Sequence, residues 1–335
     1  MVGGSMGVAE LEHGGRLQQA RARFPGAPEP FIDLSTGINP VPWPVPALPP
    51  AAWARLPEPG EEQALRQAAA KAYGVADAAM IAAAPGTQLL IQLLPRLFPQ
   101  REISILGPTY AEHAACWRAA GSLVREVENA SALDDAAAVV VCNPNNPDGR
   151  WHSPAMLQAL ADRCAARGGL LVVDEAFADL EEEQTGCSGL LPHPGLLLLR
   201  SFGKSYGLAG LRLGFALAAP ERVAAIRAAL GPWAVSGPAI AIGVAALDDA
   251  AWRRAASVRL AQDAVQLDAL LSAAGLRVLG GTRLFRLVQG NGPAWFDRLG
   301  QAGILVRCFS HRPSWLRFGM PGNAAAWARL EAALG

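Results

Sequence analysis

Short apolar runs alternate with longer stretches of mixed polarity through the first two thirds of the chain. The apolar runs have the length and composition of buried strands, and they cover residues 79–84, 102–106, 136–142, 169–173, 195–200 and 211–216. Helix-compatible stretches lie between them, near residues 88–98, 111–120 and 154–167. Strands that alternate with helices of this length predict βαβ units with right-handed crossovers. The expected fold class is therefore α/β, with a mainly parallel sheet.

The two ends of the chain have a different texture. Residues 40–59 contain eight of the 26 prolines, which predicts an extended, helix-free arm or linker before a helix over 61–73. After residue 216, the expected helices cover 220–230, 248–271 and 323–334, and shorter strands cover 276–279, 284–288, 304–308 and 315–318. This pattern predicts three parts, namely an N-terminal arm over 1–45, a large domain over 46–216 and a smaller α+β domain over 217–335.

Composition excludes several classes of protein. Of the 335 residues 51% are hydrophobic, which argues against disorder, and 29 basic residues balance 29 acidic ones, which leaves no electrostatic footprint for nucleic acid. The most apolar long stretch, residues 236–247, is shorter than the roughly 20 residues of a membrane-spanning helix. The chain opens with MVGGSMGVAE, which lacks a basic-then-apolar leader, so we expect a cytoplasmic protein.

The cysteines, histidines and lysines limit the kinds of active site that the chain can form. The five cysteines and five histidines are scattered, without C-x-x-C or H-x-x-x-H spacing, so we expect reduced thiols and no metal site. Only two of the 29 basic residues are lysines, Lys71 and Lys204. A retained lysine suits an amine nucleophile, a role that arginine cannot fill. On composition alone, two surface lysines left by chance are an equally good interpretation.

Polar residues follow the predicted strands at the edge where parallel sheets bind ligands. Gly86 and Thr87 follow the first strand and open a helix, which suits a phosphate or a simple helix cap. Tyr110 follows the second strand and is either an aromatic plate over a ligand or an ordinary packed tyrosine. The asparagines up to Asn146 follow the third strand and form a turn that also supplies side-chain donors.

The fourth and fifth strands end in an acid and an amine. Asp174 directly follows a buried apolar run, so it needs a cation or hydrogen-bond donors, of which a structural arginine is the simplest. Lys204 follows the fifth strand, with Ser201 three residues before it and Arg212 eight after it. Pyridoxal phosphate needs these groups: a lysine for its aldehyde, a carboxylate that keeps its pyridine nitrogen protonated, and donors for its phosphate. A carboxylate at contact distance typically shifts such a pKa by roughly 1–3 units.

Three motifs occur in a diagnostic order: Asn146-Pro147-x-Gly149, Asp174-Glu175-Ala176-Phe177, and Ser201-x-x-Lys204 with Arg212. In this the chain resembles the fold-type I pyridoxal-phosphate enzymes of the aspartate aminotransferase superfamily, over nearly its whole length. The resemblance implies that Lys204 binds the cofactor aldehyde and that Asp174 pairs with the pyridine nitrogen. It also implies further contacts with the cofactor from six residues: Asn146 with the phenolate oxygen, Tyr110 stacked on the ring, and the phosphate held by Gly86, Thr87, Ser201 and Arg212.

A closer resemblance is to the threonine-phosphate decarboxylases, cobalamin-pathway relatives of histidinol-phosphate aminotransferase. It rests on HGGRL at 13–17, LSTGINP at 34–40, APGTQ at 84–88 and DEAF at 174–177. It implies conversion of L-threonine O-3-phosphate to (R)-1-amino-2-propanol O-2-phosphate and carbon dioxide by a homodimer. The implied substrate contacts are Arg317 with the α-carboxylate, Arg307 with the phosphate, and Asn39 and His13 from the arm.

Two departures and three rival interpretations accompany this resemblance. Phe177 stands where many relatives have a tyrosine that reaches the phenolate oxygen, and Leu56 stands where a tyrosine often reaches the partner subunit's cofactor. The spacing alone does not separate decarboxylation from transamination by an amino-acid aminotransferase. A serine acyl-enzyme would need Lys-Thr-Gly and Ser-Asp-Asn triplets, which do not occur. A pyridoxal-binding regulator would need an added DNA-binding domain and a basic patch.

Overall fold

The computed structural model describes residues 13–133, 135–181 and 186–335, so the opening residues used for the leader prediction lie outside it. Its centre is a seven-stranded sheet in the order β2-β8-β7-β6-β5-β3-β4. The strands are β2 (Ile81–Ala84), β3 (Glu102–Leu106), β4 (Leu123–Val127), β5 (Val139–Cys142), β6 (Leu171–Asp174), β7 (Leu196–Ser201) and β8 (Gly214–Ala218). Neighbours from β4 to β7 are parallel, whereas β8 is antiparallel to both of its neighbours. The predicted mainly parallel α/β sheet is confirmed.

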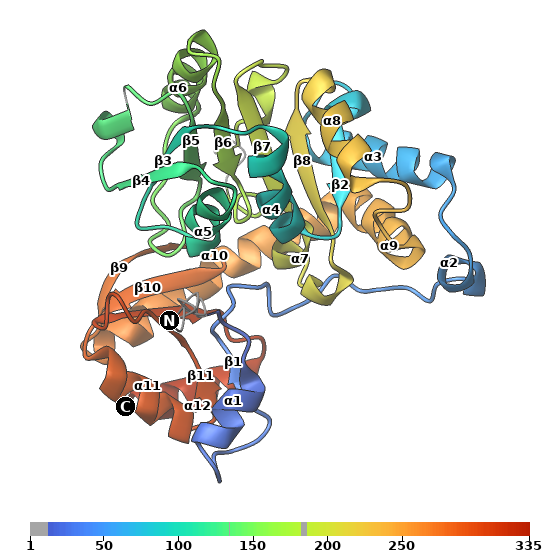
Figure 1. Cartoon of the computed structure of the whole chain (residues 1–335). Helices are drawn as coiled ribbons and strands as arrows, with labels where there is room; N and C mark the ends of the chain where they lie inside the picture. The colour runs from blue at the N-terminus through green and yellow to red at the C-terminus, as the bar shows by residue number, and fades with distance from the viewer. Residues whose placement is uncertain (1–12, 134, 182–185) are drawn as a thin grey trace, which may run out of the picture.

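Helices cover both faces of this sheet (Figure 1). They are α3 (Pro59–Tyr73), α4 (Thr87–Leu97), α5 (Ala111–Ala119), α6 (Pro154–Ala166), α7 (Phe202–Ser205), α8 (Pro220–Leu230) and α9 (Gly237–Asp248). Alternate strand residues face opposite cores: Val139 and Val141 pack with α3, α6 and α9, while Val140 packs with α4, α5 and α8. Helices α8 and α9 follow residue 216 in the chain, yet both pack on the large sheet.

A smaller antiparallel sheet lies below the first one in Figure 1. Its order is β12-β13-β10-β9, and its strands are β9 (Arg277–Thr282), β10 (Phe285–Gln289), β12 (Arg307–Cys308) and β13 (Trp315–Gly319). Three helices pack on it: α10 (Ala250–Ala273), α11 (Gly292–Gln301) and α12 (Ala324–Leu334). Leu260 and Leu267 of α10 share a core with Phe285 and Phe318, which unites the long helix with this sheet.

The N-terminal arm packs beside the smaller sheet, as Figure 1 shows for α1 (Leu17–Arg23) and β1 (Ile32–Asp33). Strand β1 pairs in parallel with β11 (Ile304–Leu305). The backbone of Leu34 continues this contact, because its N–H donates to Leu305 and its carbonyl accepts from Gly319 of β13. The predicted single strand over 304–308 is therefore two short strands, since β11 pairs with the arm and β12 pairs with β13.

Two segments differ from the expectations. The prediction that residues 40–59 are free of helix is wrong, because α2 (Pro50–Ala54) forms there with Pro50 in the first turn, where proline costs no hydrogen bond. The apolar stretch over 236–247 folds as α9, a helix of 12 residues capped by Ser236. Among the described residues, the search found no helix long and apolar enough to cross a membrane.

Candidate active site

The loops after five strands of the large sheet meet the smaller sheet and the arm around one cavity of about 720 Å³. The structure brings eleven of the twelve sequence-predicted site residues to its wall, namely His13, Gly86, Thr87, Tyr110, Asn146, Asp174, Ser201, Lys204, Arg212, Arg307 and Arg317. Asn39 is the exception. Its side chain donates to the carbonyl of Ser205 and accepts from Arg259, so it braces the segment that carries Lys204 instead of facing the cavity.

Asp174 is buried at the end of β6 and has two hydrogen-bond partners. Its Oδ2 lies 2.9 Å from Nε2 of His113, and its Oδ1 accepts from the backbone of Ala176. Burial alone would raise the pKa of Asp174, but His113, Lys204 and the Ala176 N–H outweigh it and hold that pKa below its usual value. Asp174 is therefore an anion facing the cavity, as a partner of a protonated pyridine must be.

His113 is the cation that faces Asp174, where the simplest sequence expectation was an arginine. Its side chain is buried on α5 between Asp174 and Cys142. Burial lowers its pKa, yet the hydrogen bonds and charges of Cys142 and Asp174 prevail and raise it to about 10. Sequence reasoning missed His113, because a single histidine inside an amphipathic helix carries no spacing signal.

Lys204 lies in the short helix α7, directly after β7. Its Nζ stands 4.9 Å from the centroid of the Phe177 ring. Burial lowers the pKa of Lys204, and the positive charges of Arg317 and Arg212 act in the same direction against the opposing effect of Asp174. The neutral amine, which is the nucleophile, is thus present at a lower pH than in an exposed lysine.

The corner formed by Gly86, Thr87 and Arg212 is built from backbone and a guanidinium. Gly86 has φ of 86°, and a Cβ there would come within 2.7 Å of the Arg212 guanidinium. Thr87 begins α4, so backbone N–H groups at the helix start point toward this corner. Arg212 itself adopts a left-handed conformation, with φ of 54°, in the turn before β8. These groups make a concave, donor-rich surface that suits a phosphate.

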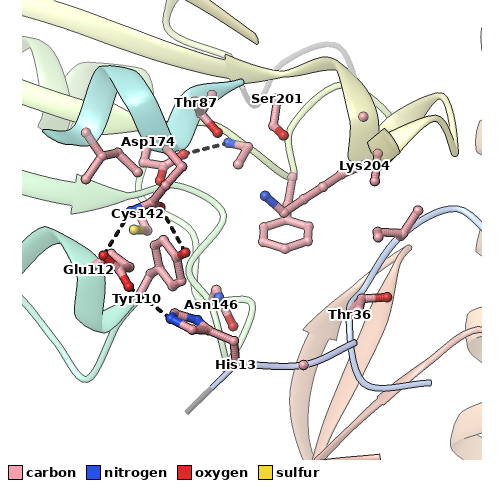
Figure 2. A pocket seen from close by; sticks show the side chains of 18 of the residues that line it. His13, Thr36, Thr87, Tyr110, Glu112, Cys142, Asn146, Asp174, Ser201 and Lys204 are labelled. Atoms are coloured by element: carbon pink, nitrogen blue, oxygen red, sulfur yellow. Dashed lines mark hydrogen bonds and ion pairs between the residues drawn. The ribbon is translucent and has the colours of Figure 1, made fainter. Parts of the chain in front are cut away.

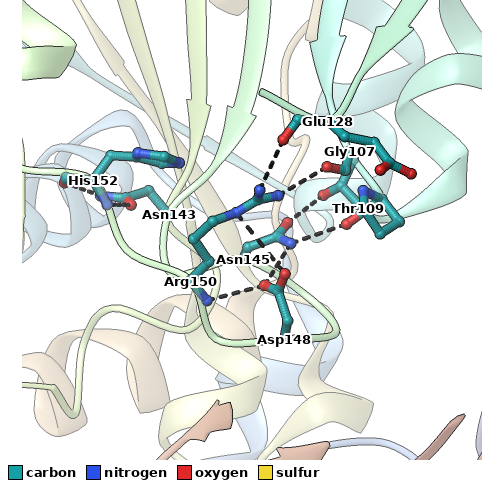
Figure 3. Close-up of polar contacts among 9 residues, drawn as sticks. Gly107, Thr109, Glu128, Asn143, Asn145, Asp148, Arg150 and His152 are labelled. Carbon is teal, nitrogen blue, oxygen red and sulfur yellow. Dashed lines mark hydrogen bonds and ion pairs between the residues drawn. The ribbon is translucent and has the colours of Figure 1, made fainter. Parts of the chain in front are cut away.

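The loop after β5 is held rigidly by polar contacts, which Figure 3 shows. The Asn145 amide accepts from Thr109 at 2.7 Å and donates to Asp148 at 2.7 Å. The Arg150 guanidinium donates to the carbonyls of Gly107 and Glu128. The loop that carries Asn146 is therefore tied to the loop that carries Tyr110, although neither Asn145 nor Arg150 was predicted as a site residue.

Two arginines of the smaller sheet complete the cavity. The buried Arg317 donates to the side chain of Asn146 and to the carbonyl of Ser35. Its Nε has no hydrogen-bond partner among the described residues, which leaves a donor for an incoming carboxylate. Burial, together with the charge of Arg307, lowers the pKa of Arg317 to about 9. A bound anion would therefore stabilise the charged form of Arg317. The Arg307 guanidinium lies over the ring of Phe309.

The chain belongs to the class I and II aminotransferase family, whose family model matches residues 45–333. It is similar to the threonine-phosphate decarboxylase of Sinorhizobium sp, with 46% identity over 97% of this chain and 98% of the relative. The threonine-phosphate decarboxylase of Pseudomonas aeruginosa is 45% identical over 97% of both chains.

Solved structures show the same fold. The histidinol-phosphate aminotransferase of Sinorhizobium meliloti, in complex with pyridoxal-5'-phosphate, superposes with a TM-score of 0.79 at 21% identity and covers 97% of both chains. The L-threonine-O-3-phosphate decarboxylase of Porphyromonas gingivalis gives a TM-score of 0.73 at 22% identity over 85% of this chain and 94% of that one. At this identity the likeness establishes the fold-type I architecture, with its mainly parallel sheet and separate antiparallel sheet.

Proposed function

We propose that this chain is a pyridoxal-phosphate-dependent decarboxylase that acts on L-threonine O-3-phosphate in cobalamin biosynthesis. The observation that carries the proposal is the similarity, over nearly the whole length, to two threonine-phosphate decarboxylases at 46% and 45% identity. The cavity supports it, because an amine, a buried carboxylate and two arginines line the same space. One arginine that can bind a carboxylate and a second that can bind a phosphate match a substrate with two anionic groups.

The residues of the cavity fit the cofactor pyridoxal 5'-phosphate. Gly86 leaves room beside Arg212 that a Cβ would fill, so a phosphate can approach the backbone there. We infer that Thr87 and Ser201 add hydroxyl donors to the same phosphate, and that the Tyr110 ring lies against the cofactor ring. When bound, this cofactor supplies an electron sink, because its protonated ring accepts the electron pair released at the substrate Cα.

The roles of the large-domain residues follow from their chemistry. The carboxylate of Asp174, fixed by His113, holds a proton on the pyridine nitrogen. Asn146 donates to the phenolate oxygen without help from Phe177, which has no hydroxyl. Lys204, whose amine stands within the cavity beside Phe177, would hold the cofactor through its aldehyde.

The substrate is oriented by residues from the smaller sheet and the arm. We infer that Arg317 binds the α-carboxylate through its unpartnered Nε, and that Arg307 and His13 bind the phosphate. Loss of carbon dioxide breaks the bond between Cα and the carboxyl carbon and leaves an electron pair at Cα. Replacing the carboxylate by hydrogen consumes one proton; Lys204, once it has taken this proton from solvent, would deliver it to Cα and return to the neutral amine.

The deciding experiment is incubation of the purified holoenzyme with L-threonine O-3-phosphate in the absence of any keto acid. We expect release of carbon dioxide and the appearance of 1-amino-2-propanol O-2-phosphate by mass spectrometry. Lys204→Ala is the control, with turnover at least about a thousandfold lower. Strict dependence on 2-oxoglutarate would instead assign an aminotransferase, such as the histidinol-phosphate aminotransferase of Symbiobacterium thermophilum, which is 31% identical over 71% of this chain.

We also propose that the enzyme is a cytoplasmic homodimer. Trp53 and Leu56 are 69% and 63% exposed at the end of α2, and Trp233 is 53% exposed shortly before α9. These two segments are packed together, since a Cβ on Gly237 would lie 2.4 Å from the carbonyl of Ala52. Exposed large apolar side chains on adjoining segments support an interface between subunits. The buried thiols of Cys142, Cys164 and Cys187 are free, which suits a reducing compartment.

A further inference from the structure

A connected set of side chains links the N-terminal arm to the aromatic ring in the cavity (Figure 2). The Tyr110 hydroxyl donates to Oε1 of Gln88 at 3.0 Å, and Nε2 of Gln88 donates to Oε2 of Glu112 at 2.8 Å. The other carboxylate oxygen, Oε1 of Glu112, lies 2.9 Å from Nε2 of His13. A single carboxylate therefore joins residues from α4, α5 and the arm.

The direction of these hydrogen bonds depends on the charge of Glu112. A carboxylate only accepts, so Gln88 must turn its NH₂ group toward Glu112 and its carbonyl oxygen toward Tyr110. If the Gln88 amide rotated by half a turn, its oxygen would face the carboxylate, so the bond to Glu112 would be lost and the bond to the Tyr110 hydroxyl would reverse its direction. The negative charge thus fixes the Gln88 amide, and the amide in turn fixes the hydroxyl of Tyr110.

Glu112 also contacts the side chain of His13, in a segment of the arm whose backbone packs against Ser35. A Cβ on Gly14 would lie 2.5 Å from the carbonyl of Ser35, and the N–H of Gly15 donates to the Ser35 hydroxyl at 2.7 Å. His13, next to these glycines, is 41% exposed, whereas its partner Glu112 is 16% exposed and lies in the first turn of α5, where the helix dipole favours an anion. The fixed carboxylate therefore orients the more exposed imidazole.

We propose that Glu112 is a positioning residue with two effects. It accepts from Nε2 of His13 and so orients the ring with Nδ1 on the side away from Glu112, where Nδ1 of the protonated imidazole donates to the anionic group of the substrate. Through Gln88 it also holds the ring of Tyr110 against the cofactor. The first effect rests on the proposed function for the identity of the anion, the phosphate of L-threonine O-3-phosphate. The second needs only the bound cofactor.

The test compares Glu112→Gln with the unaltered holoenzyme and with Glu126→Gln as a matched control. Glu126 forms an exposed ion pair with Arg118 at 2.6 Å, so the control removes the same charge from the same region. In Glu112→Gln we expect KM for L-threonine O-3-phosphate to rise about tenfold and kcat to stay within about twofold, because one charge-assisted contact in binding is lost. Visible circular dichroism of the bound cofactor should change as well, since Tyr110 is released.

Two further variants separate the two effects. His13→Ala combined with Glu112→Gln should raise KM no more than His13→Ala alone, because Glu112 acts through His13. Gln88→Met keeps the charges of His13 and Glu112, so it should change the cofactor dichroism as Glu112→Gln does while raising KM less. If Glu112→Gln failed to fold, the cofactor dichroism of Gln88→Met would test the link to Tyr110. The KM of His13→Ala would then test the contact with the substrate anion.

The proposal is overturned if Glu112→Gln keeps both the KM and the cofactor dichroism of the unaltered enzyme. It is equally overturned if the KM effects of His13→Ala and Glu112→Gln multiply, because Glu112 would then act independently of His13. Absence of carbon dioxide release by the unaltered enzyme would overturn the proposed function instead. In that case the dichroism of the variants would still decide whether Glu112 positions Tyr110.

Discussion

At the scale of single residues, the chemistry of the cavity depends on groups whose charge states are set by their neighbours. Asp174 stays ionised although it is buried, because His113 supplies a hydrogen bond and a positive charge. Lys204 is shifted the other way, toward the neutral amine, by burial and by Arg317 and Arg212. The same cavity therefore holds an ionised carboxyl at Asp174 and favours a neutral amine at Lys204.

His113→Gln tests the charge of the buried pair. Because the pKa of His113 is raised to about 10, its protonation stabilises the fold fully below its unfolded pKa of about 6.5, and this contribution is lost as the pH rises to about 10. We expect the variant to lose about 3 kcal/mol of unfolding free energy at pH 6 and progressively less toward pH 10. Chemical denaturation at a series of pH values measures this difference.

The control for this experiment is His193→Gln. His193 makes a similar contact with Asp162 at 3.0 Å, but that carboxylate is 62% exposed, so little free energy is at stake. A deficit in His113→Gln that did not vary between pH 6 and pH 10 would show that the imidazole is neutral in the folded protein.

The sequence could predict which residues follow a strand, but not which distant residues they contact in the folded protein. Lys204 and Asp174 are visible because each comes directly after a buried apolar run at the ligand-binding edge of a sheet. His113 is 61 residues from Asp174 in the chain and meets it only when α5 packs on the large sheet. Asn39 was expected at the substrate, but a residue type cannot tell whether its amide faces a cavity or an adjoining helix.

At the scale of secondary structure, glycines decide how closely the two sheets approach. Gly149, in the loop after β5, has φ of 71°, and a Cβ there would lie 2.0 Å from the carbonyl oxygen of Gly281 in β9. Backbone cannot yield to this contact as a flexible side chain would. The loop that carries Asn146 therefore sits directly on the smaller sheet, beside the contact between Asn146 and Arg317.

Gly149→Ala is expected to separate these elements. The left-handed φ and the clash with Gly281 should together lower the unfolding free energy by about 3 kcal/mol and raise KM, because Arg317 and Asn146 would move apart. Gly121→Ala is the control, since Gly121 has a similar φ of 92° and nothing within 4 Å of an added Cβ. Thermal unfolding of both variants gives the comparison. Equal losses would mean that the close approach to β9 costs nothing.

The elements that sequence missed have physical explanations. β4 is an edge strand whose residues are mostly exposed or half-buried, with Leu123 66% exposed, so it lacks the apolar run that marks the central strands. α2 forms among prolines because Pro50 occupies the first turn, where the missing N–H removes no hydrogen bond within the helix. The central strands and long helices were predictable because burial dictates their composition, whereas edges and short helices depend on local contacts.

At the scale of the whole molecule, the exposed apolar side chains of Trp53 in α2 and Leu56 just after it predict assembly into a dimer. We expect sedimentation to give twice the chain mass of 35.0 kDa. Trp53→Asp combined with Leu56→Asp should shift the protein to the monomer and lower turnover, because charges would be buried at the interface. Val265→Asp, on α10 at a position that is 71% exposed, is the control and should leave the mass unchanged. A monomeric unaltered enzyme would contradict the proposed homodimer.

The pairing of β1 with β11 has a consequence for biosynthesis. Ile32 meets Ile304, about 270 residues further along the chain, and Leu34 is bonded to both Leu305 and Gly319. A growing polypeptide leaves the ribosome from its N-terminus, so β1 emerges long before the strands that receive it are translated. The stretch around β1 is therefore made long before it can find its place, and a nascent chain released before β11 is translated would leave that stretch without its partner strands.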